Sequence, residues 1–384
     1  MNRAQLEIDK LKDLGLYREL KLARVDGSRV FIDGRAHINL ASNDYLSMAG
    51  RLDFQREFLR SLRESGEYLM GSTSSRLLVG NFSAYEKAES EIGAIYGKSC
   101  LFYNSGYHAN TGIIPAIASS KDLILADKLV HASIIDALSL TKAKWLRYAH
   151  NDMQHLRELL EKNRRDYERV FIVSEGVFSM DGDMADLEAL IEIKKQYDAL
   201  LYIDEAHSFG LFGERGLGLC FERDSGKDID FIMCTLGKAL GSEGAFVICD
   251  ELWRKLLINK SRPLIFTTAL APINIMWTLF SFRKMLEMRA EREHLRNVGS
   301  RFREALSGFK ILGQSQIVQL VLGEPQKALN FLKRLAEANI WASAVRPPTV
   351  PKNSSRIRFS LCAGLSDDDI DYCSNAVLKI LKTL

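Results

Sequence analysis

The sequence lacks the features that mark a membrane protein or a nucleic-acid-binding protein. No apolar run approaches the roughly 20 residues that a bilayer-spanning helix needs. The first residues include acidic side chains and no apolar segment, so we expect no signal peptide. Lysine plus arginine number 52 and aspartate plus glutamate number 49, and the net charge of +3 is too small to indicate a nucleic acid or a membrane surface as a partner.

Cysteine is also scarce and scattered. The six cysteines form no Cys-x-x-Cys pair, and several of them lie inside apolar runs. This pattern argues against a disulfide framework and against a metal centre, and it favours buried thiols in a reducing compartment. We therefore predict a cytoplasmic protein that binds no metal.

The sequence does contain enough apolar residues for more than one core. Hydrophobic residues make up 47% and charged residues 26% of the 384 residues, which is typical of a globular protein. A chain of this length indicates two domains. We predict an N-terminal helix and arm at 1–36, a large domain at 37–265, and a smaller C-terminal domain at 266–384 that includes a long linking helix at about 273–307.

Strands and helices alternate most clearly between about 120 and 250. Runs rich in branched apolar residues, such as 170–173 and 231–234, predict strands, and the segments between them predict helices. Strands that are apolar throughout are buried on both faces, which is typical of a largely parallel sheet covered by helices. The predicted fold class is therefore α/β, with a smaller α/β domain after about 265.

The N-terminal region carries two local signals. Leucines at helical spacing predict an amphipathic helix over about the first 25 residues. Further along, Asp33-Gly34 lies between two short apolar runs, and this pair predicts a tight hairpin turn.

Lys238 lies just beyond the strand predicted at 231–235. Its neighbours are apolar or small, so its ammonium group should be poorly solvated and its pKa should lie below the usual value of about 10.4. A partly neutral lysine is suited to Schiff-base chemistry. The alternative is a structural lysine whose side chain extends from the strand end to water.

Several other polar residues follow the ends of neighbouring strands. They are His131, Ser179, Asp204, His207 and Thr235. Each has an ordinary explanation when it is considered alone, for example a helix cap for the aspartate. Ligands of α/β sheets, however, bind beyond the carboxyl ends of the strands, so we expect these side chains to converge on one site with the lysine.

The segment 99–111 predicts an anion site. It reads as a strand, a tight turn at Ser105-Gly106 and a helix, so that the first backbone N–H groups of the helix face outward. Such a helix start binds anions, and this pattern suits one phosphate better than a pyrophosphate. A Schiff-base lysine, a carboxylate and a phosphate site are together what pyridoxal phosphate (PLP) requires.

Four motifs in the chain also resemble those of the α-oxoamine synthases, which are fold-type I PLP-dependent enzymes. The motifs are Ser42-Asn43-Asp44-Tyr45-Leu46, Glu175 to Asp183, Asp204-Glu205-Ala206-His207 and Thr235 to Gly241. The resemblance covers nearly the whole chain. It implies a large domain with a mostly parallel sheet, a smaller C-terminal α/β domain, and a homodimer with active sites at the subunit interface.

The resemblance also implies residue roles. Catalysis would fall to Lys238, His131, Asp204 and His207, with the Schiff base on Lys238, the pyridine nitrogen paired to Asp204 and the ring stacked on His131. Ser179 and His207 would reach the phenolic oxygen of the cofactor. The phosphate would be held by Gly106, Tyr107 and Thr235, and by Thr267 or Thr268 of the neighbouring subunit. The substrate contacts would be Arg18, Asn43, His131, Arg346 and Thr349, with Arg346 a candidate for the amino-acid carboxylate.

The resemblance implies the condensation of an amino acid with an acyl thioester and loss of CO2. The segment 346–351 is most similar to that of the biotin-pathway member, which joins L-alanine to a pimeloyl group on coenzyme A or acyl carrier protein. Three alternatives remain open. They are a sister enzyme that uses glycine or serine with another acyl-CoA, an aminotransferase of the same fold, and a non-catalytic protein that keeps the cofactor pocket.

Overall fold

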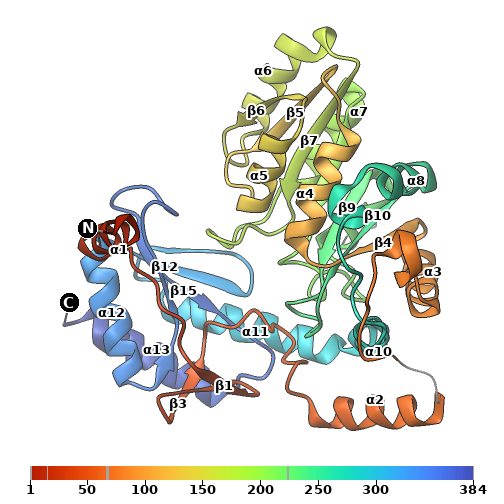
Figure 1. Ribbon diagram of the computed structural model, residues 1–384. Coiled ribbons are helices and arrows are strands. Elements are labelled where there is room, and N and C mark those ends of the chain that lie inside the picture. Colours follow the sequence, from red (N-terminus) through yellow and green to blue (C-terminus); the bar gives the residue numbers. More distant parts are fainter. Residues whose placement is uncertain (1, 15, 66–68, 223–224, 384) are drawn as a thin grey trace.

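The computed structural model describes residues 2–14, 16–65, 69–222 and 225–383. Its centre is a seven-stranded sheet in the order β4-β10-β9-β8-β7-β5-β6 (Figure 1). In this sheet only β10 runs opposite to the other six strands, so the predicted mostly parallel sheet is confirmed. The strands are β4 (Ser99–Tyr103), β5 (Asp122–Asp127), β6 (Lys144–Tyr148), β7 (Arg169–Glu175), β8 (Leu200–Asp204), β9 (Phe231–Thr235) and β10 (Ala245–Cys249).

Helices cover both faces of this sheet. Along β5, Leu123 and Leu125 enter one apolar core, whereas Ile124 and Ala126 enter a second core on the opposite face. This alternation is the two-residue period of a strand. The helices of the large domain are α3 (Ser83–Tyr96), α4 (Gly106–Ile117), α5 (Ala132–Leu140), α6 (Met153–Asn163), α7 (Leu187–Tyr197) and α8 (Glu251–Lys260). α3, α6 and α7 contribute to the first core and α4, α5 and α8 to the second.

A smaller antiparallel sheet forms the C-terminal part, in the order β11-β12-β15-β14. Its strands are β11 (Ile311–Leu312), β12 (Ile317–Gly323), β14 (Ser343–Val345) and β15 (Ser355–Ser360). The helices α12 (Pro325–Glu337) and α13 (Asp367–Leu381) pack against it through Phe331 and Val377, next to Ile357 and Phe359 of the sheet. The predicted smaller α/β unit is therefore present.

The N-terminal strands join this C-terminal part. β1 (Ala23–Asp26), β2 (Arg29–Ile32) and β3 (Arg35–Asn39) are antiparallel, and β3 pairs in parallel with β13 (Ile340–Trp341). The hairpin prediction is confirmed, since Asp33 and Gly34 lie between β2 and β3 with φ values of 50° and 78°. Positive φ at both central positions is what a type I′ hairpin turn requires.

Two helix predictions were wrong. The first helix, α1 (Arg3–Asp13), ends far short of residue 25 and buries no side chain, so no packing extends it. The long linking helix is two helices, α10 (Pro272–Glu287) and α11 (Arg289–Ala305), separated at Met288, whose ψ of 47° is not helical. The Arg292 guanidinium donates to the Met285 carbonyl oxygen at 2.7 Å and thereby satisfies the end of α10.

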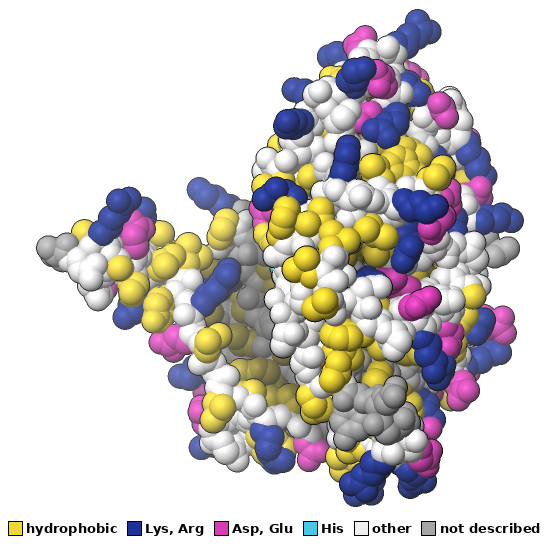
Figure 2. All heavy atoms as spheres, turned by 45° about the vertical axis from the view of Figure 1, so that its right-hand side comes forward, with side chains coloured by type: hydrophobic (Ala, Val, Ile, Leu, Met, Phe, Trp, Pro, Cys, Tyr) yellow, Lys and Arg dark blue, Asp and Glu magenta, His cyan; other side chains and the backbone are white. Residues whose placement is uncertain are grey.

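Two further helices, α2 (Leu52–Ser65) and α9 (Arg262–Ile265), were not predicted. None of the described helices combines the length and the apolarity that crossing a membrane demands. Figure 2 shows apolar side chains gathered in a band down one face of the molecule. Large apolar side chains are exposed in the segment Arg76–Gly80 and just after α9, where they are Leu77, Leu78, Val79 and Phe266.

Candidate active site

The carboxyl ends of β7, β8 and β9 lie side by side in the large sheet. Glu175 at the end of β7 pairs in register with Asp204 at the end of β8, and Asp204 pairs with Met233 of β9. Lys238 lies three residues beyond the end of β9, and His207 lies three residues beyond Asp204. The topology therefore brings these strand ends to one edge, as the rule for ligand sites in α/β sheets predicts.

Lys238 is half-buried at this edge. Its Nζ lies 2.8 Å from His207 Nε2. Burial lowers the pKa of Lys238 to about 8, although the carboxylates of Asp204 and Glu175 act in the opposite direction; the Arg358 guanidinium adds to the lowering. The predicted depression of the lysine pKa is thus present in the folded chain. An amine that is partly neutral near pH 8 can act as a nucleophile or as a base.

Asp204 is 3% exposed and is held by two neutral donors. Its Oδ2 accepts from Asn110 Nδ2 at 2.9 Å, and its Oδ1 accepts from the Ala206 backbone N–H at 2.9 Å. Asn110 in turn donates to Ser133 Oγ at 2.9 Å and accepts from the Tyr202 hydroxyl at 2.5 Å. The carboxylate is therefore fixed in position without a salt bridge to any described residue, which leaves its charge available for a ligand.

His207 connects Lys238 to Tyr45. The ring is 5% exposed, and its Nδ1 lies 2.6 Å from the Tyr45 hydroxyl. Burial and the ammonium of Lys238 hold the pKa of His207 well below 6.5, so the ring is neutral. A neutral imidazole accepts at one nitrogen and donates at the other. The three side chains therefore form a hydrogen-bonded chain that ends at the lysine amine.

His131 begins α5 and faces the same edge. Its Nδ1 accepts from the Ser133 backbone N–H at 3.2 Å, and its own backbone N–H donates to Glu175 Oε1 at 2.5 Å. His131 is exposed to solvent. Partial desolvation lowers the pKa of His131; the carboxylate of Asp204 opposes this and the ammonium of Lys238 adds to it. The ring therefore shares one electrostatic environment with Asp204 and Lys238.

The start of α4 lies beside the end of β9. Ser105 caps the helix by accepting from the His108 backbone N–H at 3.2 Å. A Cβ on Gly106 would lie 3.4 Å from Thr235 Oγ1, so the glycine keeps this corner open. Tyr107 is exposed and its hydroxyl donates to Asp136. The unpaired backbone N–H groups of the first helical turn thus lie next to the Thr235 hydroxyl, as an anion site requires.

Arg358 is a member of this cluster that the sequence analysis missed. It extends from β15 of the small sheet, is 8% exposed, and donates through Nε to the Ser179 carbonyl oxygen at 3.1 Å. Its two terminal nitrogens lie 3.3 Å from Asn43 Oδ1, and one of them lies 3.4 Å from the Tyr45 hydroxyl. No described carboxylate forms an ion pair with it. The structure therefore adds an arginine and a tyrosine to the predicted set and brings Asn43 and Ser179 to the same place.

The other predicted residues lie around this cluster. We call the side chains of Lys238, Asp204, His207, His131, Tyr45, Asn43 and Arg358 the Lys238 cluster. Arg18 is exposed in the segment after α1 and has no hydrogen bond or ion pair with these residues. Arg346 is half-buried on the loop after β14, where its carbonyl oxygen accepts from the backbone N–H of the exposed Thr349 at 3.1 Å. Thr267 and Thr268 follow α9, and the Thr268 carbonyl oxygen accepts from Asn104 Nδ2 at 2.8 Å. Roles for these five residues in substrate or phosphate binding stay predictions.

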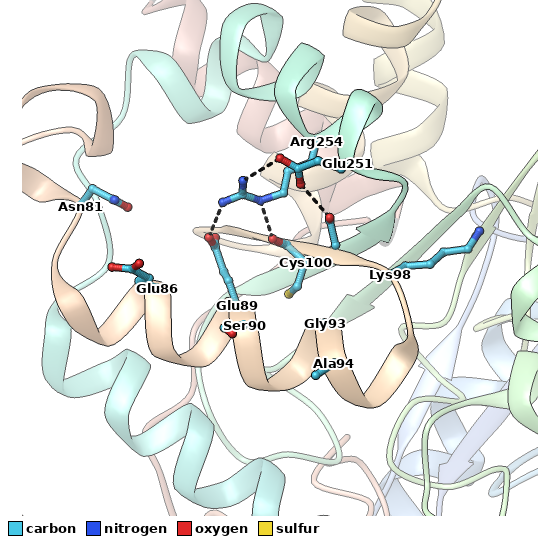
Figure 3. Close-up of a pocket in the computed structure, with 11 residues that line it drawn as sticks. Asn81, Glu86, Glu89, Ser90, Gly93, Ala94, Lys98, Cys100, Glu251 and Arg254 are labelled. Atoms are coloured by element: carbon cyan, nitrogen blue, oxygen red, sulfur yellow. Dashed lines mark hydrogen bonds and ion pairs between the residues drawn. The ribbon is translucent and has the colours of Figure 1, made fainter.

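A separate polar cavity of 520 Å³ lies between α3, β4 and α8 (Figure 3). The carboxylate of Glu89 accepts there from Arg76 at 2.5 Å, from Arg254 at 2.9 Å and from the Phe102 backbone N–H at 2.9 Å. Both oxygens of this buried carboxylate are paired with cations. The arrangement is that of a structural ion cluster, so this cavity is not the candidate site.

Comparison with known proteins gives a consistent result. The family described as aminotransferase class I and II matches residues 35–377. The 8-amino-7-oxononanoate synthase of Chlorobaculum parvum is 46% identical, with 97% of each chain covered. The enzyme of the same name from Haemophilus ducreyi is 42% identical, with 95% of this chain and 97% of that protein covered.

Solved structures show the same relationship. The serine palmitoyltransferase (SPT) of Sphingomonas wittichii superposes with a TM-score of 0.91 at 29% identity, covering 100% of this chain and 97% of that one. An SPT structure that contains PLP superposes with a TM-score of 0.90 at 27% identity, covering 99% and 97%. The 8-amino-7-oxononanoate synthase from Francisella tularensis gives a TM-score of 0.76 at 29% identity, covering 90% and 98%.

Proposed function

The chain belongs to the family of class I and II aminotransferases and, within it, to the 8-amino-7-oxononanoate synthases, and from this premise we propose that it condenses L-alanine with a pimeloyl thioester. The products are 8-amino-7-oxononanoate, CO2 and a free thiol, in a step of biotin biosynthesis. The chain is thus a PLP-dependent acyltransferase. The observation that carries this proposal is the half-buried Lys238 amine, which contacts the neutral His207 beside the buried Asp204.

The residues at the strand edge fit PLP. Lys238 offers an amine with a lowered pKa to the aldehyde, and Asp204 offers a buried carboxylate without a cationic partner among the described residues. The corner kept open by Gly106, next to Thr235 and the first N–H groups of α4, offers an anion site for the phosphate. When bound, PLP supplies an electron sink that stabilises negative charge at the substrate α-carbon.

Lys238 is the proposed acid and base of the reaction. With a pKa of about 8 in the folded chain, a useful fraction of the amine is neutral at physiological pH. It removes the α-proton of L-alanine and returns a proton to the same carbon after CO2 has left. His207 orients the amine through the 2.8 Å contact between Lys238 Nζ and its Nε2, and Tyr45 fixes the imidazole from the other side.

Arg358 is the proposed binding group for the carboxylate of L-alanine. Its guanidinium is buried among neutral acceptors. Its 3.3 Å hydrogen bonds to Asn43 are long and therefore weak, so a substrate carboxylate, which forms stronger charge-assisted hydrogen bonds, can replace them. It also lies close enough to Lys238 to lower the pKa of the amine. The resemblance to the α-oxoamine synthases had implied this role for Arg346. We keep Arg346, together with Arg18 and Thr349, as proposed contacts for the acyl substrate.

A homodimer is proposed as the functional unit. The exposed apolar side chains Leu77, Leu78, Val79 and Phe266 belong to two neighbouring segments, Arg76–Gly80 and the end of α9. Exposed apolar surface of this kind is typical of a protein interface. Thr267 and Thr268 follow Phe266 directly, so a second copy seated on this surface would bring its threonines toward a neighbouring active site, as the resemblance implies.

The six cysteines support the proposed cytoplasmic location. All of them are buried free thiols, and burial raises the pKa values of Cys100, Cys220 and Cys234. Such thiols are unreactive packing groups rather than disulfide partners. We also propose that the partners are the small-molecule substrates. If a carrier protein delivers the acyl group, acyl carrier protein is a further partner.

The test is an assay of the purified, PLP-loaded protein with pimeloyl-CoA or pimeloyl-acyl carrier protein and one amino acid at a time. We expect CO2 and free thiol to appear with L-alanine and much less with glycine or L-serine. Preference for serine with a long-chain acyl-CoA would assign the chain to the SPT reaction instead. Exchange of an amino acid with a keto acid, without thioester consumption, would indicate an aminotransferase.

A further inference from the structure

A second cavity lies between α11 and the loop Gly313–Gln316, on the side of the small sheet. Its volume is 290 Å³, and its wall combines three arginines with apolar side chains and the polar residues of the loop. The apolar part comes from Met184, Leu211, Phe212 and Leu295. None of the residues of the Lys238 cluster lines this cavity.

The three arginines lie on one face of α11. Arg292, Arg296 and Arg303 are spaced by four and seven residues, which places them in one stripe of an α-helix. Gly299 lies in the same stripe, and a Cβ there would lie only 3.2 Å from Arg303 Nη1. The glycine therefore gives the Arg303 guanidinium room to lie along the helix at the cavity wall.

Within the described residues, Arg292 and Arg303 donate hydrogen bonds to neutral acceptors. Arg292 is 2% exposed and donates to the carbonyl oxygens of Met285 at 2.7 Å and Glu214 at 2.8 Å. Arg303 is half-buried and donates to the Ser315 carbonyl oxygen at 2.6 Å and to Ser300 Oγ at 3.3 Å. Arg296 forms no ion pair with a described carboxylate.

The nearest acidic residues on α11 are engaged elsewhere. Glu293 pairs with Arg289 at 2.8 Å, and Glu291 lies 3.9 Å from Arg51. Burial lowers the pKa values of Arg292 and Arg303. The neighbouring Arg296 adds to the lowering at Arg292, whereas the carboxylates of Glu291 and Glu293 act in the opposite direction without forming an ion pair with it. Three positive charges around one cavity, none of them in an ion pair with a carboxylate of the described residues, favour an anionic ligand.

The wall also limits the kind of anion. The apolar side chains would leave an inorganic ion poorly solvated, whereas they suit a short hydrocarbon chain. The volume of 290 Å³ lies just below the range of about 300–1,000 Å³ that is usual for small-molecule sites. We propose that the cavity between α11 and the loop Gly313–Gln316 binds a small aliphatic carboxylate, with its head group at Arg296 and Arg303.

Two residues that line this cavity also form hydrogen bonds with the segments that carry active-site residues. Gln316, which lines the cavity, donates through Nε2 to the His207 carbonyl oxygen at 2.8 Å. Ser315 donates through Oγ to the Gly182 carbonyl oxygen at 2.9 Å, in the segment that carries Ser179. A ligand in the cavity therefore touches residues that support His207 and Ser179. The proposal itself rests on residues outside that cluster and does not depend on the proposed function.

Calorimetric titration of the full-length, PLP-loaded protein with hexanoate tests this site. We expect saturable binding of hexanoate, and we expect Arg296→Gln to weaken it by at least about tenfold, since the variant removes one charge from the head-group end. Arg296 is exposed, so this variant should fold normally. Arg301→Gln is the matched control, because Arg301 lies on the opposite face of the same helix.

Two further ligands test the role of the arginines and the role of the apolar wall separately. Hexanamide keeps the hydrocarbon chain without the charge, and inorganic phosphate keeps the charge without the chain. Binding of hexanamide as tight as that of hexanoate would overturn the role of the arginines. Binding of phosphate without hexanoate would overturn the role of the apolar wall. Hexanoate affinity that is unchanged in Arg296→Gln, but lost in Arg358→Gln, would place the ligand in the Lys238 cluster and would also overturn the proposal.

Discussion

The chain buries charge in two different ways. In the cavity of Figure 3, the carboxylate of Glu89 is 6% exposed and is paired with Arg254. A second arginine, Arg76, pairs with its other oxygen. In the Lys238 cluster, the charged groups instead contact neutral partners. Lys238 contacts the neutral His207, and Asp204 accepts from an amide and a backbone N–H.

The difference separates a structural cluster from a functional one. A buried charge that is paired and hydrogen-bonded keeps its place and has no capacity left for a ligand. A buried charge that is held by neutral groups keeps its orientation, while its electrostatic interaction remains available. Removing these charges one at a time therefore tests whether the two clusters differ in this way.

Lys238→Ala should have the largest effect. Removing the amine takes away the group that moves the α-proton, so thioester-dependent CO2 release should fall by at least about 10⁴-fold. The cofactor-free variant should be no less stable than the parent chain near pH 7, because burial already disfavours the charged amine there. Thiol release and urea unfolding measure the two effects. A variant that retains full activity would refute the proposed function.

Glu89→Gln should show the opposite behaviour. It leaves Arg76 and Arg254 without their shared counterion, and breaking a buried ion pair in this way costs about 3–5 kcal/mol of unfolding free energy. The kcat of the folded protein should stay unchanged, since the cavity lies away from Lys238. Urea unfolding followed by circular dichroism measures the loss. Glu86→Gln, on the same helix and lining the same cavity but exposed, is the control and should change stability little.

Arg358→Gln should affect substrate binding more than folding. Loss of charge-assisted hydrogen bonds of about 1.5–3 kcal/mol corresponds to a rise of about 10–100-fold in the KM for L-alanine. The pKa of Lys238 should also rise, because one neighbouring cation has been removed. Arg356→Gln is the control on the same strand. Since Arg356 pairs with Asp181, its loss should reduce stability and leave the alanine KM unchanged. Equal effects of both variants on KM would show that Arg358 has no special role.

The sequence indicated the part of this site that lies on the parallel strands. Buried strands can be recognised from continuous branched apolar runs, and the ends of neighbouring parallel strands meet at one edge. Asp204, His207 and Lys238 were therefore expected together before any contact was known. The resemblance to a known family added the role of each residue.

The presence of Arg358 at this site could not be predicted from the ends of the parallel strands, because Arg358 lies on β15 of the small sheet. Its position depends on how β15 and the strands of the large sheet pack, and no local pattern encodes that packing. One signal was available, since Arg356 and Arg358 alternate with Ile357 and Phe359, and an alternating strand with arginines on one face indicates a second polar face. The break at Met288 was missed for a similar reason, because the Arg292 contact that caps α10 forms only in the folded chain.

Replacing His150 should have the smallest effect on stability. His150 is intermediate between the Glu89 ion pairs and the Lys238 cluster, because it is a titratable cation with two acidic partners near the strand ends. Its Nδ1 lies 2.9 Å from Asp127 Oδ1 and its Nε2 lies 2.8 Å from Asp183 Oδ2. Burial acts to lower the pKa of His150, but the two hydrogen bonds outweigh it and raise the pKa to about 10. Because the folded-state pKa lies above the unfolded value of about 6.5, this imidazolium stabilises the fold fully below pH 6.5. That contribution decreases as the pH rises toward 10.

His150→Gln should therefore destabilise the chain by about 1–2 kcal/mol at pH 6, and by progressively less up to pH 10. Unfolding in urea at several pH values measures the difference from the parent chain. Gln154→Ala, at an exposed position in the first turn of α6, is the control and should shift stability little. A destabilisation that is equal at pH 6 and pH 10 would mean that His150 contributes by packing against Phe178 rather than by charge. The pKa of His150 is raised, whereas the pKa of Lys238, which has no hydrogen-bonded carboxylate, is lowered. A pH-independent result would mean that ion pairing does not explain this difference.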